Sequence, residues 1–305
     1  MKVIKHYFFA TRPSFLTITL FGCLIGILSN RGSISQHWGI NLMAVGVAVF
    51  THAAANVIND YFDYLNGTDS INLDRVSPYT GGSRYIQEKT FNPKEIKRFG
   101  LMLLMISIGT GLYLCHLSTW TLLPIGICCI AIAWMYSAPP FELMSRGLLG
   151  ELAIALSWAL IVLGFASLQA NRYDGEATLT ALAYGLMVAN ILFLNQIPDI
   201  KADRHAKKMT LAVQSPAKHL WIWYLVFLVS AYMLQITAVC LGYNSLYTLI
   251  TFLIAPLFIR CAIKLKNGSL DHSLMRVVIP LNILSVHLYA LLLCLGLLIE
   301  TKALF

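Results

Sequence analysis

Nine apolar stretches determine what this chain can fold into. They lie approximately at residues 13–29, 39–62, 98–115, 119–138, 148–169, 177–198, 219–241, 244–264 and 277–299. A helix needs about 20 consecutive apolar residues to cross the hydrocarbon core of a bilayer. Only 12% of the 305 residues are charged, whereas a soluble domain has about 25%. The sequence therefore predicts an all-α integral membrane protein with about nine transmembrane helices.

The basic residues predict how these helices are oriented. If the N-terminus is cytoplasmic, 19 of the 22 Lys and Arg residues lie in cytoplasmic segments, and only Arg31, Arg172 and Lys302 lie outside. Cytoplasmic loops of membrane proteins carry such an excess, so we expect a cytoplasmic N-terminus. The net charge of +8 has the same origin, so no nucleic acid partner is expected. The seven cysteines show no paired spacing and predict neither disulfides nor a zinc site.

Two groups of acidic residues follow the second and sixth apolar stretches. Asp60, Asp63, Asp69 and Asp74 lie in NDYFDYLNGTDSINLD, and Asp199 and Asp203 lie in NQIPDIKADRHAKK. Each segment contains an Asn-x-x-x-Asp sequence at the end of its apolar stretch, four stretches apart, which indicates a duplicated four-helix unit. Carboxylates at a membrane helix end are costly, and they are usually functional or solvated.

Helical spacing places the first group of polar residues on one face. At about 100° per residue, His52, Asn56, Asn59 and Asp63 form a stripe, with Asp60 at its margin. His52 either contacts a substrate or hydrogen-bonds to a neighbouring helix, and the sequence leaves both open.

The second group has the same character. Asn195, Asp199 and Asp203 are four residues apart, and Pro198 is expected to bend this helix end. The two polar faces are expected to converge at the mouth of a central cavity open to the cytoplasmic side. Mg²⁺ favours a few carboxylate ligands together with water and substrate phosphates, so this mouth is a candidate magnesium site.

Basic residues follow both acidic groups. They are Arg75 and Arg84 after the first, and Lys201, Arg204, Lys207 and Lys208 after the second. Carboxylate-held Mg²⁺ with flanking cations suits a diphosphate, because the metal bridges acidic protein to acidic ligand. The alternative for each single Lys or Arg is that it only sets the topology.

The two acidic motifs, NDYFDYLNGTD and NQIPDIKADR, resemble the paired aspartate-rich motifs of the UbiA superfamily of intramembrane aromatic prenyltransferases. Three further segments, SPYTGGSR, YSAPPF and IPDIKADRHAKKMTLAV, are most similar to the 1,4-dihydroxy-2-naphthoate polyprenyltransferases of menaquinone synthesis. The resemblance covers residues 1–305 and implies a single membrane domain. The short loops and the lack of a transit peptide favour a bacterial inner membrane.

The resemblance implies Mg²⁺-dependent transfer of a polyprenyl group from an isoprenyl diphosphate to a small aromatic acceptor. The implied catalytic residues and metal ligands are Asn59, Asp63, Asp199 and Asp203. The implied substrate-binding residues are Asn56, Asp60, Asp69, Arg75, Arg84, Arg146, Asn195, Lys201 and Arg204.

One segment departs from the family pattern. Members of this branch often have a lysine and a tyrosine after PPF, where this chain has ELMSRG, residues 142–147. Either Arg146 supplies the positive charge, or the acceptor is 4-hydroxybenzoate or another phenol. A secondary transporter is the alternative from another class, but we would expect it to place its ionisable residues near the bilayer midplane. Here they lie at one face.

Overall fold

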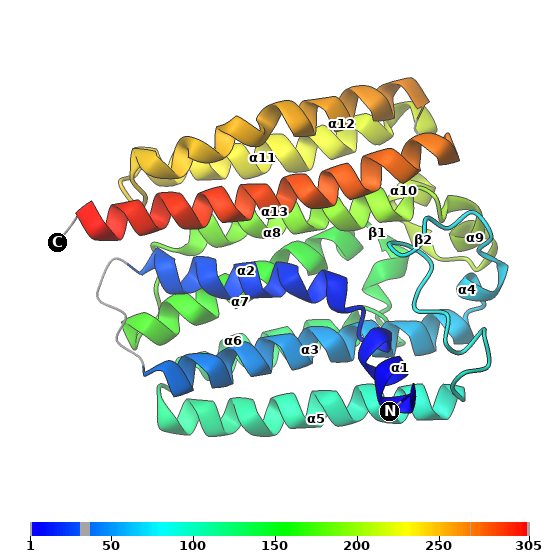
Figure 1. Ribbon diagram of the computed structural model, residues 1–305, viewed down its shortest axis with the longest axis horizontal. Coiled ribbons are helices and arrows are strands. Elements are labelled where there is room, and N and C mark those ends of the chain that lie inside the picture. Colours follow the sequence, from blue (N-terminus) through cyan, green and yellow to red (C-terminus); the bar gives the residue numbers. More distant parts are fainter. Residues whose placement is uncertain (1, 31–36, 269, 304–305) are drawn as a thin grey trace.

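Long apolar helices lie side by side through most of this computed structural model, which describes residues 2–30, 37–268 and 270–303 (Figure 1). In lipid, every backbone N–H and C=O group must find a partner within the protein, and a helix satisfies them all internally. The apolar stretches therefore fold as helices.

The long helices are α2 (Pro13–Ser29), α3 (Trp38–Leu65), α5 (Pro93–Leu117), α6 (Leu122–Met135), α7 (Leu148–Ala170), α8 (Thr178–Gln196), α11 (Leu220–Cys240), α12 (Ala255–Gly268) and α13 (His272–Ala303). The shorter elements are α1 (Lys2–Ala10), α4 (Thr68–Ile71), α9 (Ile200–His205), α10 (Leu211–Gln214), the 3₁₀ helices η1 (Leu143–Ser145), η2 (Ala217–His219) and η3 (Leu246–Ile254), and the strands β1 (Arg146–Gly147) and β2 (Met209–Thr210).

Each of the nine predicted stretches coincides with helix, although the count of full spans is lower. Within the described residues, seven helical stretches are long and apolar enough to cross a membrane, and α1 with α2 forms an eighth candidate bent by 53°. The stretch predicted at 119–138 is represented by α6, which has only 14 residues. The prediction of an all-α integral membrane protein is confirmed, and nine is an approximate count.

Two groups of helices, each with its own buried core, build most of the bundle, and a small third core that includes Cys23 and Ala44 joins them. The larger core lies among α2, α7, α8, α11, α12 and α13, and contains fully buried Tyr184, Tyr224 and Phe193. A smaller core joins α3 and α5 to α1 through residues such as Val57 and Ile96. A cavity lies between the two groups.

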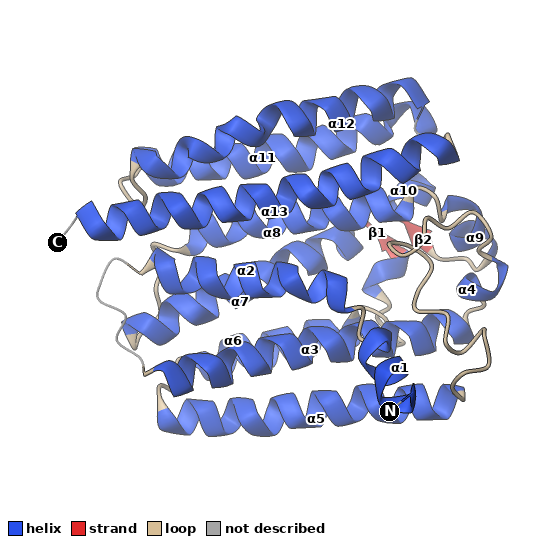
Figure 2. Cartoon of the chain, in the orientation of Figure 1, coloured by secondary structure: helices blue, strands red, loops and turns tan. Residues whose placement is uncertain are grey.

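All the short elements between α3 and α5, and between α8 and α11, gather at one end of the bundle, which we name the loop end (Figure 1). The two strands in this region are the one sheet in the described chain (Figure 2). They pair in parallel, Arg146 with Met209 and Gly147 with Thr210. This pairing ties the loop before α7 to the loop after α9, and so positions residues 203–210 beside the cavity.

Candidate functional site

A cavity of about 670 Å³ runs from the loop end deep between the two helix groups. Its wall includes residues of α3 from Ala44 to Asp63, a distance of 19 positions, or about 28 Å along a helix. Most of its wall is apolar, and the charged residues lie at the loop end. The cavity therefore has a charged mouth and a long apolar interior.

The first Asn-x-x-x-Asp sequence, which ends at Asp63, lies on a continuous helix, α3. His52, Asn56, Asn59 and Asp63 all line the cavity, as the helical spacing predicts. Asn59 donates from Nδ2 to the Ser137 hydroxyl at 3.3 Å. This contact joins α3 to the loop after α6.

The second acidic motif crosses a break in the helix. α8 ends at Gln196, and α9 begins at Ile200, so the predicted bend at Pro198 is a complete interruption. The break turns Asp199 toward the loop after α3, where its Oδ1 accepts a hydrogen bond from Asn72 Nδ2 at 2.7 Å. Asp203 lies one turn further on α9 and is buried. Both carboxylates line the cavity mouth.

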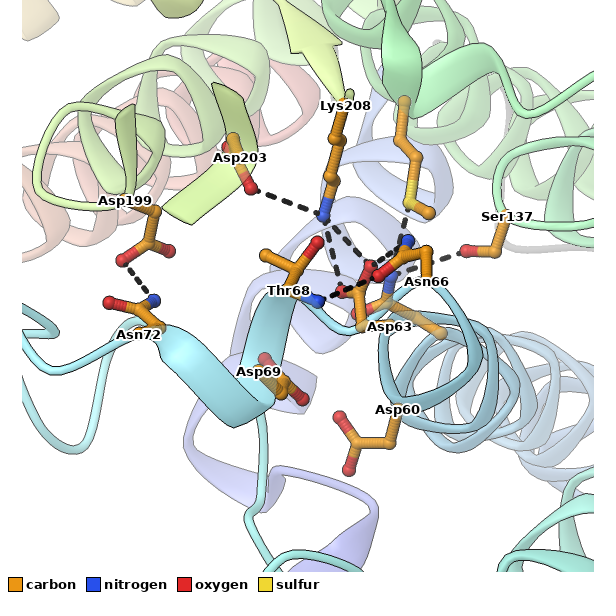
Figure 3. Close-up of polar contacts among 12 residues, drawn as sticks. Asp60, Asp63, Asn66, Thr68, Asp69, Asn72, Ser137, Asp199, Asp203 and Lys208 are labelled. Carbon is orange, nitrogen blue, oxygen red and sulfur yellow. Dashed lines mark hydrogen bonds and ion pairs between the residues drawn. The ribbon is translucent and has the colours of Figure 1, made fainter. Parts of the chain in front are cut away.

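Lys208 connects the two motifs (Figure 3). Its Nζ lies 3.0 and 3.2 Å from the two carboxylate oxygens of Asp63, and 3.9 Å from Asp203 Oδ1. Burial alone would lower the pKa of Lys208, but Asp63 and Asp203 raise it above its ordinary value. The lysine therefore remains charged between the carboxylates.

Arg12 provides a second cation from the start of the chain. It precedes Pro13, the first residue of α2, where the right-handed helical conformation is disfavoured, and it adopts the left-handed conformation at φ 55°. This kink between α1 and α2 directs its guanidinium toward α3. There it forms an ion pair with Asp60 and donates to Asn59 Oδ1 at 3.1 Å.

The loop of residues 66–92 covers the acidic groups closely. Gly82 has φ +70°, and a Cβ there would lie 2.6 Å from Asp69 Oδ2 and 3.0 Å from Asp60 Oδ1. Only glycine allows the backbone to pass these carboxylates at this distance. Ser83 N donates to the Asp60 carboxylate at 3.3 Å. Gly81 and Gly82 line the cavity, so their backbone faces the same space.

Four of the five carboxylates at the mouth are buried, the fifth, Asp199, is half-buried, and together they outnumber the cations. Desolvation, followed by repulsion from Asp63 and Asp60, raises the pKa of Asp69 to about 7. Desolvation also raises the pKa of Asp203 to about 7, and it raises the pKa of Asp199 as well. Five carboxylates, those of Asp60, Asp63, Asp69, Asp199 and Asp203, share this region with Arg12 and Lys208. The site therefore has an excess of negative charge that a bound cation would relieve.

The donor set fits Mg²⁺ in its chemistry. All the acidic groups are hard oxygen ligands, and Asn59 and Asn72 add amide oxygens, of which Asn72 Oδ1 is buried and unpaired. Among the described residues no three His, Cys, Asp or Glu side chains already form a closed metal cluster. Lys208 lies between Asp63 and Asp203. Such an open arrangement suits a metal that completes its shell with water and ligand phosphates.

The predicted site residues separate into two sets. Those along the cavity wall are Asn56, Asn59, Asp63, Asp69, Asn195, Asp199 and Asp203. Asp60 is not part of the wall, but it forms an ion pair with Arg12, which is. The second set is the predicted basic residues, which are not part of the wall.

Each of these basic residues is placed elsewhere. Arg84 donates to the backbone carbonyl of Asp69, and Arg146 donates to the Pro140 carbonyl at 2.6 Å. Lys201 pairs with Asp74 at 2.9 Å, and Arg204 donates to the Val213 carbonyl at 3.3 Å. The Arg75 carbonyl lies 3.4 Å from His272 Nε2. The positive charge at the mouth comes instead from Arg12, which was not predicted, and from Lys208, which was predicted only as one of the basic residues that follow the second acidic group.

Comparison with known proteins agrees with this geometry. The profile of the UbiA prenyltransferase family matches residues 18–298. The chain belongs to the UbiA prenyltransferase family. This membership accounts for the two aspartate-rich motifs, which lie at the one cavity mouth.

Curated relatives of this UbiA member include three bacterial enzymes named 1,4-dihydroxy-2-naphthoate octaprenyltransferase. The protein of Mycobacterium tuberculosis is 34% identical over 178 residues, which cover 58% of each chain. That of Mycobacterium leprae is 29% identical, over 79% of this chain and 78% of the relative. That of Bacillus subtilis is 25% identical, over 81% of this chain and 77% of the relative.

Solved structures show the same fold. A UbiA homologue of Archaeoglobus fulgidus bound to DMAPP and Mg²⁺ has a TM-score of 0.59 at 15% identity, covering 93% of this chain and 98% of the other. A structure described for digeranylgeranylglyceryl phosphate synthase has a TM-score of 0.63 at 18% identity, covering 97% and 99%. At these identities the likeness establishes the helical architecture.

Proposed function

We propose that this family member transfers a polyprenyl group from a polyprenyl diphosphate to 1,4-dihydroxy-2-naphthoate, with Mg²⁺ as cofactor. One observation carries the proposal: buried carboxylates of both motifs, with Arg12 and Lys208, surround the mouth of a long apolar cavity. The acceptor is inferred from the bacterial relatives with that name.

The charged mouth fits the diphosphate. Asn59, Asp63, Asp199 and Asp203 would hold Mg²⁺, which supplies neutralisation of the charge that grows on the leaving diphosphate. Lys208 and Arg12 bring two further positive charges to the same place, and they are positioned before the reaction begins. The basic residues Arg75, Arg84, Arg146, Lys201 and Arg204 lie outside the cavity wall, so we assign this role to Lys208 and Arg12.

The apolar interior fits the prenyl chain and the reactive cation. When the C1–O bond breaks, the bonding electrons leave with the diphosphate and C1 becomes an allylic cation. Residues such as Ala48, Phe165 and Leu168 line the cavity behind the mouth, and they exclude water that would capture this cation. A ring carbon of the acceptor then forms the bond to C1. With a naphthoate acceptor, its carboxylate leaves as carbon dioxide, and the electron pair stays in the ring.

The location follows from the same features. We propose a bacterial inner membrane, with the N-terminus and the loop end on the cytoplasmic side, where both substrates enter. The distribution of 19 basic residues on that side supports this orientation. We further propose that residues 1–305 form a single prenyltransferase domain.

The test is product identification. Membranes containing the protein receive a polyprenyl diphosphate, Mg²⁺ and either 1,4-dihydroxy-2-naphthoate or 4-hydroxybenzoate, and mass spectrometry identifies the products. We expect a prenylated product that has lost the carboxylate, and we expect it to be absent in Asp63→Ala and Asp199→Ala. Product from 4-hydroxybenzoate alone would retain the chemistry and change the acceptor. Failure to bind the diphosphate would refute the proposal.

A further inference from the structure

Between the charged mouth and the apolar interior, the cavity has a band of neutral polar side chains. We propose that His52 and Asn56 in this band form the subsite that binds the hydroxyl groups of the aromatic acceptor. The inference rests on the proposed function, because it assigns the place of the second substrate in the same cavity.

His52 presents one unused ring nitrogen to the cavity. Its Nδ1 lies 2.8 Å from the Thr19 hydroxyl of α2, which fixes one side of the ring. Its ring also makes an edge contact with Trp158, with centroids 4.9 Å apart and planes at 83°. Nε2 has no hydrogen-bond partner within the described part of the chain, and the residue is part of the cavity wall. The imidazole is therefore held in place with one polar atom left over.

Asn56 repeats this arrangement one turn closer to the mouth. Its Nδ2 donates to the Thr11 carbonyl at 2.9 Å, and no residue that the structure describes bonds to its Oδ1. Asn195 of α8 lines the same cavity, and its Oδ1 is buried and unpaired. His52 Nε2, Asn56 Oδ1 and Asn195 Oδ1 thus have no hydrogen-bond partner among the residues that the structure describes. Buried polar groups normally find partners, so a ligand is the natural partner here.

The neighbouring hydroxyl side chains differ, because each has a partner within the protein. The hydroxyls of Thr51 and Ser107 lie 2.5 Å apart, and Ser107 donates to the Val47 carbonyl at 2.9 Å. Ser157 donates to the Ala153 carbonyl at 2.9 Å. These groups hide their polarity from the cavity, as a wall that contacts a hydrocarbon chain should. His52 and Asn56 do not hide theirs.

The position along α3 suits an aromatic acceptor. Asn56 lies three residues from Asn59, and His52 lies seven residues away, which corresponds to about 4.5 and 10.5 Å along the helix. The reacting ring carbon must lie beside C1 of the prenyl chain, just inside the diphosphate. A bicyclic acceptor placed there extends toward His52. A prenyl chain alone would leave these polar atoms unpaired in an apolar setting, which is unfavourable.

The protein contains a matched histidine that lacks this property. His287 of α13 also contacts a threonine of α2, with Nε2 2.8 Å from the Thr17 hydroxyl. Its Nδ1 lies 2.8 Å from the Ile283 carbonyl, so both nitrogens are used within the protein. His287 is not part of the cavity wall. It serves as the control for removing a membrane histidine.

The experiment compares wild type, His52→Ala, His52→Gln and His287→Ala in steady-state prenyl transfer. Two acceptors are used, 1,4-dihydroxy-2-naphthoate and 1-hydroxy-2-naphthoate, which lacks one hydroxyl. Binding of the prenyl diphosphate with Mg²⁺ is measured separately, as a check that each variant is folded and that the diphosphate site is intact.

We expect His52→Ala to raise the KM for the dihydroxy acceptor about three- to tenfold, the effect of one hydrogen bond. The KM for the prenyl diphosphate and its binding should stay unchanged, His52→Gln should recover part of the loss, and His287→Ala should match wild type. Wild type should discriminate between the two acceptors more strongly than His52→Ala does. An unchanged acceptor KM, or equal discrimination in both proteins, would overturn the inference. Absence of turnover by wild type with any acceptor would instead count against the proposed function.

Discussion

The two Asn-x-x-x-Asp motifs have the same sequence pattern, but they lie in different backbones. The first, ending at Asp63, lies on an uninterrupted α3, whereas the second, ending at Asp199, crosses the break between α8 and α9. Each is held by the other half of the chain: Lys208 contacts Asp63, and Asn72 contacts Asp199 (Figure 3). The two motifs therefore form one site, in which each motif is contacted by a residue that follows the other motif in the sequence.

This difference shows that the same residue pattern can be positioned at one site in two ways. α3 presents its polar residues at fixed helical spacing, so the stripe from His52 to Asp63 is set by the helix itself. The break after α8 places Asp199 at the start of a short separate helix, α9, which carries Asp203. The second motif is therefore positioned by contacts with the rest of the chain, such as that of Asn72 with Asp199, and not by helical spacing alone.

The largest expected effect is loss of a carboxylate in either motif. We expect Asp63→Ala and Asp199→Ala each to lower kcat/KM for prenyl transfer at least about 100-fold, the size typical of removing a group that stabilises developing charge. The double variant should be little worse than either single one, because residues that act as a unit are not additive. A variant of one motif that stays active would show that the two motifs work separately.

Asp74→Asn is the matched control for these variants. Asp74 lies in the first acidic segment, but it is exposed and pairs only with Lys201 among the described residues. We expect its activity to stay within twofold of wild type.

The next effect concerns the cation between the motifs. We expect Lys208→Met to lower activity at least about tenfold, because it removes a buried charge and leaves Asp63 and Asp203 without their shared partner. The measurement is kcat/KM over a range of Mg²⁺ concentrations. Lys207→Met is the control, since Lys207 is an exposed neighbour. Equal loss in both variants would contradict a special role for Lys208.

A smaller effect distinguishes the helices that carry the motifs. A Cβ added to Gly185 of α8 would lie 2.1 Å from the Ala155 carbonyl oxygen of α7, whereas one added to Gly46 of α3 would meet nothing within 4 Å. We expect Gly185→Ala to cost about 1–3 kcal/mol of stability through overpacking, and Gly46→Ala to be neutral or stabilising. Thermal unfolding in detergent measures both. Equal melting temperatures for Gly185→Ala and Gly46→Ala would contradict tight packing of α8 against α7 at Gly185.

The smallest effect lies at the surface of the loop end. Lys201 pairs with Asp74 at 2.9 Å, but the side chain of Lys201 is 82% exposed. Exposed ion pairs contribute about 0–1 kcal/mol, so Lys201→Ala should change kcat/KM less than twofold. A loss comparable to that of Lys208→Met would restore Lys201 as a direct participant in diphosphate binding.

Much of this architecture is predictable from the sequence, because bilayer length and helical period act locally. The apolar stretches predict the helices, and the spacing from His52 to Asp63 predicts a common face along the cavity. The break at Pro198 is predictable in place but not in extent. The 14-residue α6 is harder to predict, because hydropathy does not show where an apolar helix ends.

Which cations reach the site depends on tertiary structure, so the sequence offers Lys208 only as one of six flanking basic residues and does not indicate Arg12. Lys208 reaches Asp63 only because β1 and β2 pair and place the loop after α9 beside α3. Arg12 reaches Asp60 only because the chain kinks before Pro13. The one local feature that could have indicated Arg12 is its position directly before Pro13, the first residue of α2. Proximity in sequence to the acidic motifs favours Arg75 and Arg204 as much as Lys208, and the structure shows that neither arginine lines the cavity.

The most direct test of the account is binding of a prenyl diphosphate as a function of Mg²⁺ in wild type, Asp63→Ala, Asp199→Ala and the double variant. The account predicts tight binding in wild type that is lost when the metal is chelated. It also predicts a similar large loss in each single variant, with little further loss in the double variant. Metal-independent binding, or losses that simply add, would contradict the claim that the two motifs form one magnesium-dependent diphosphate site.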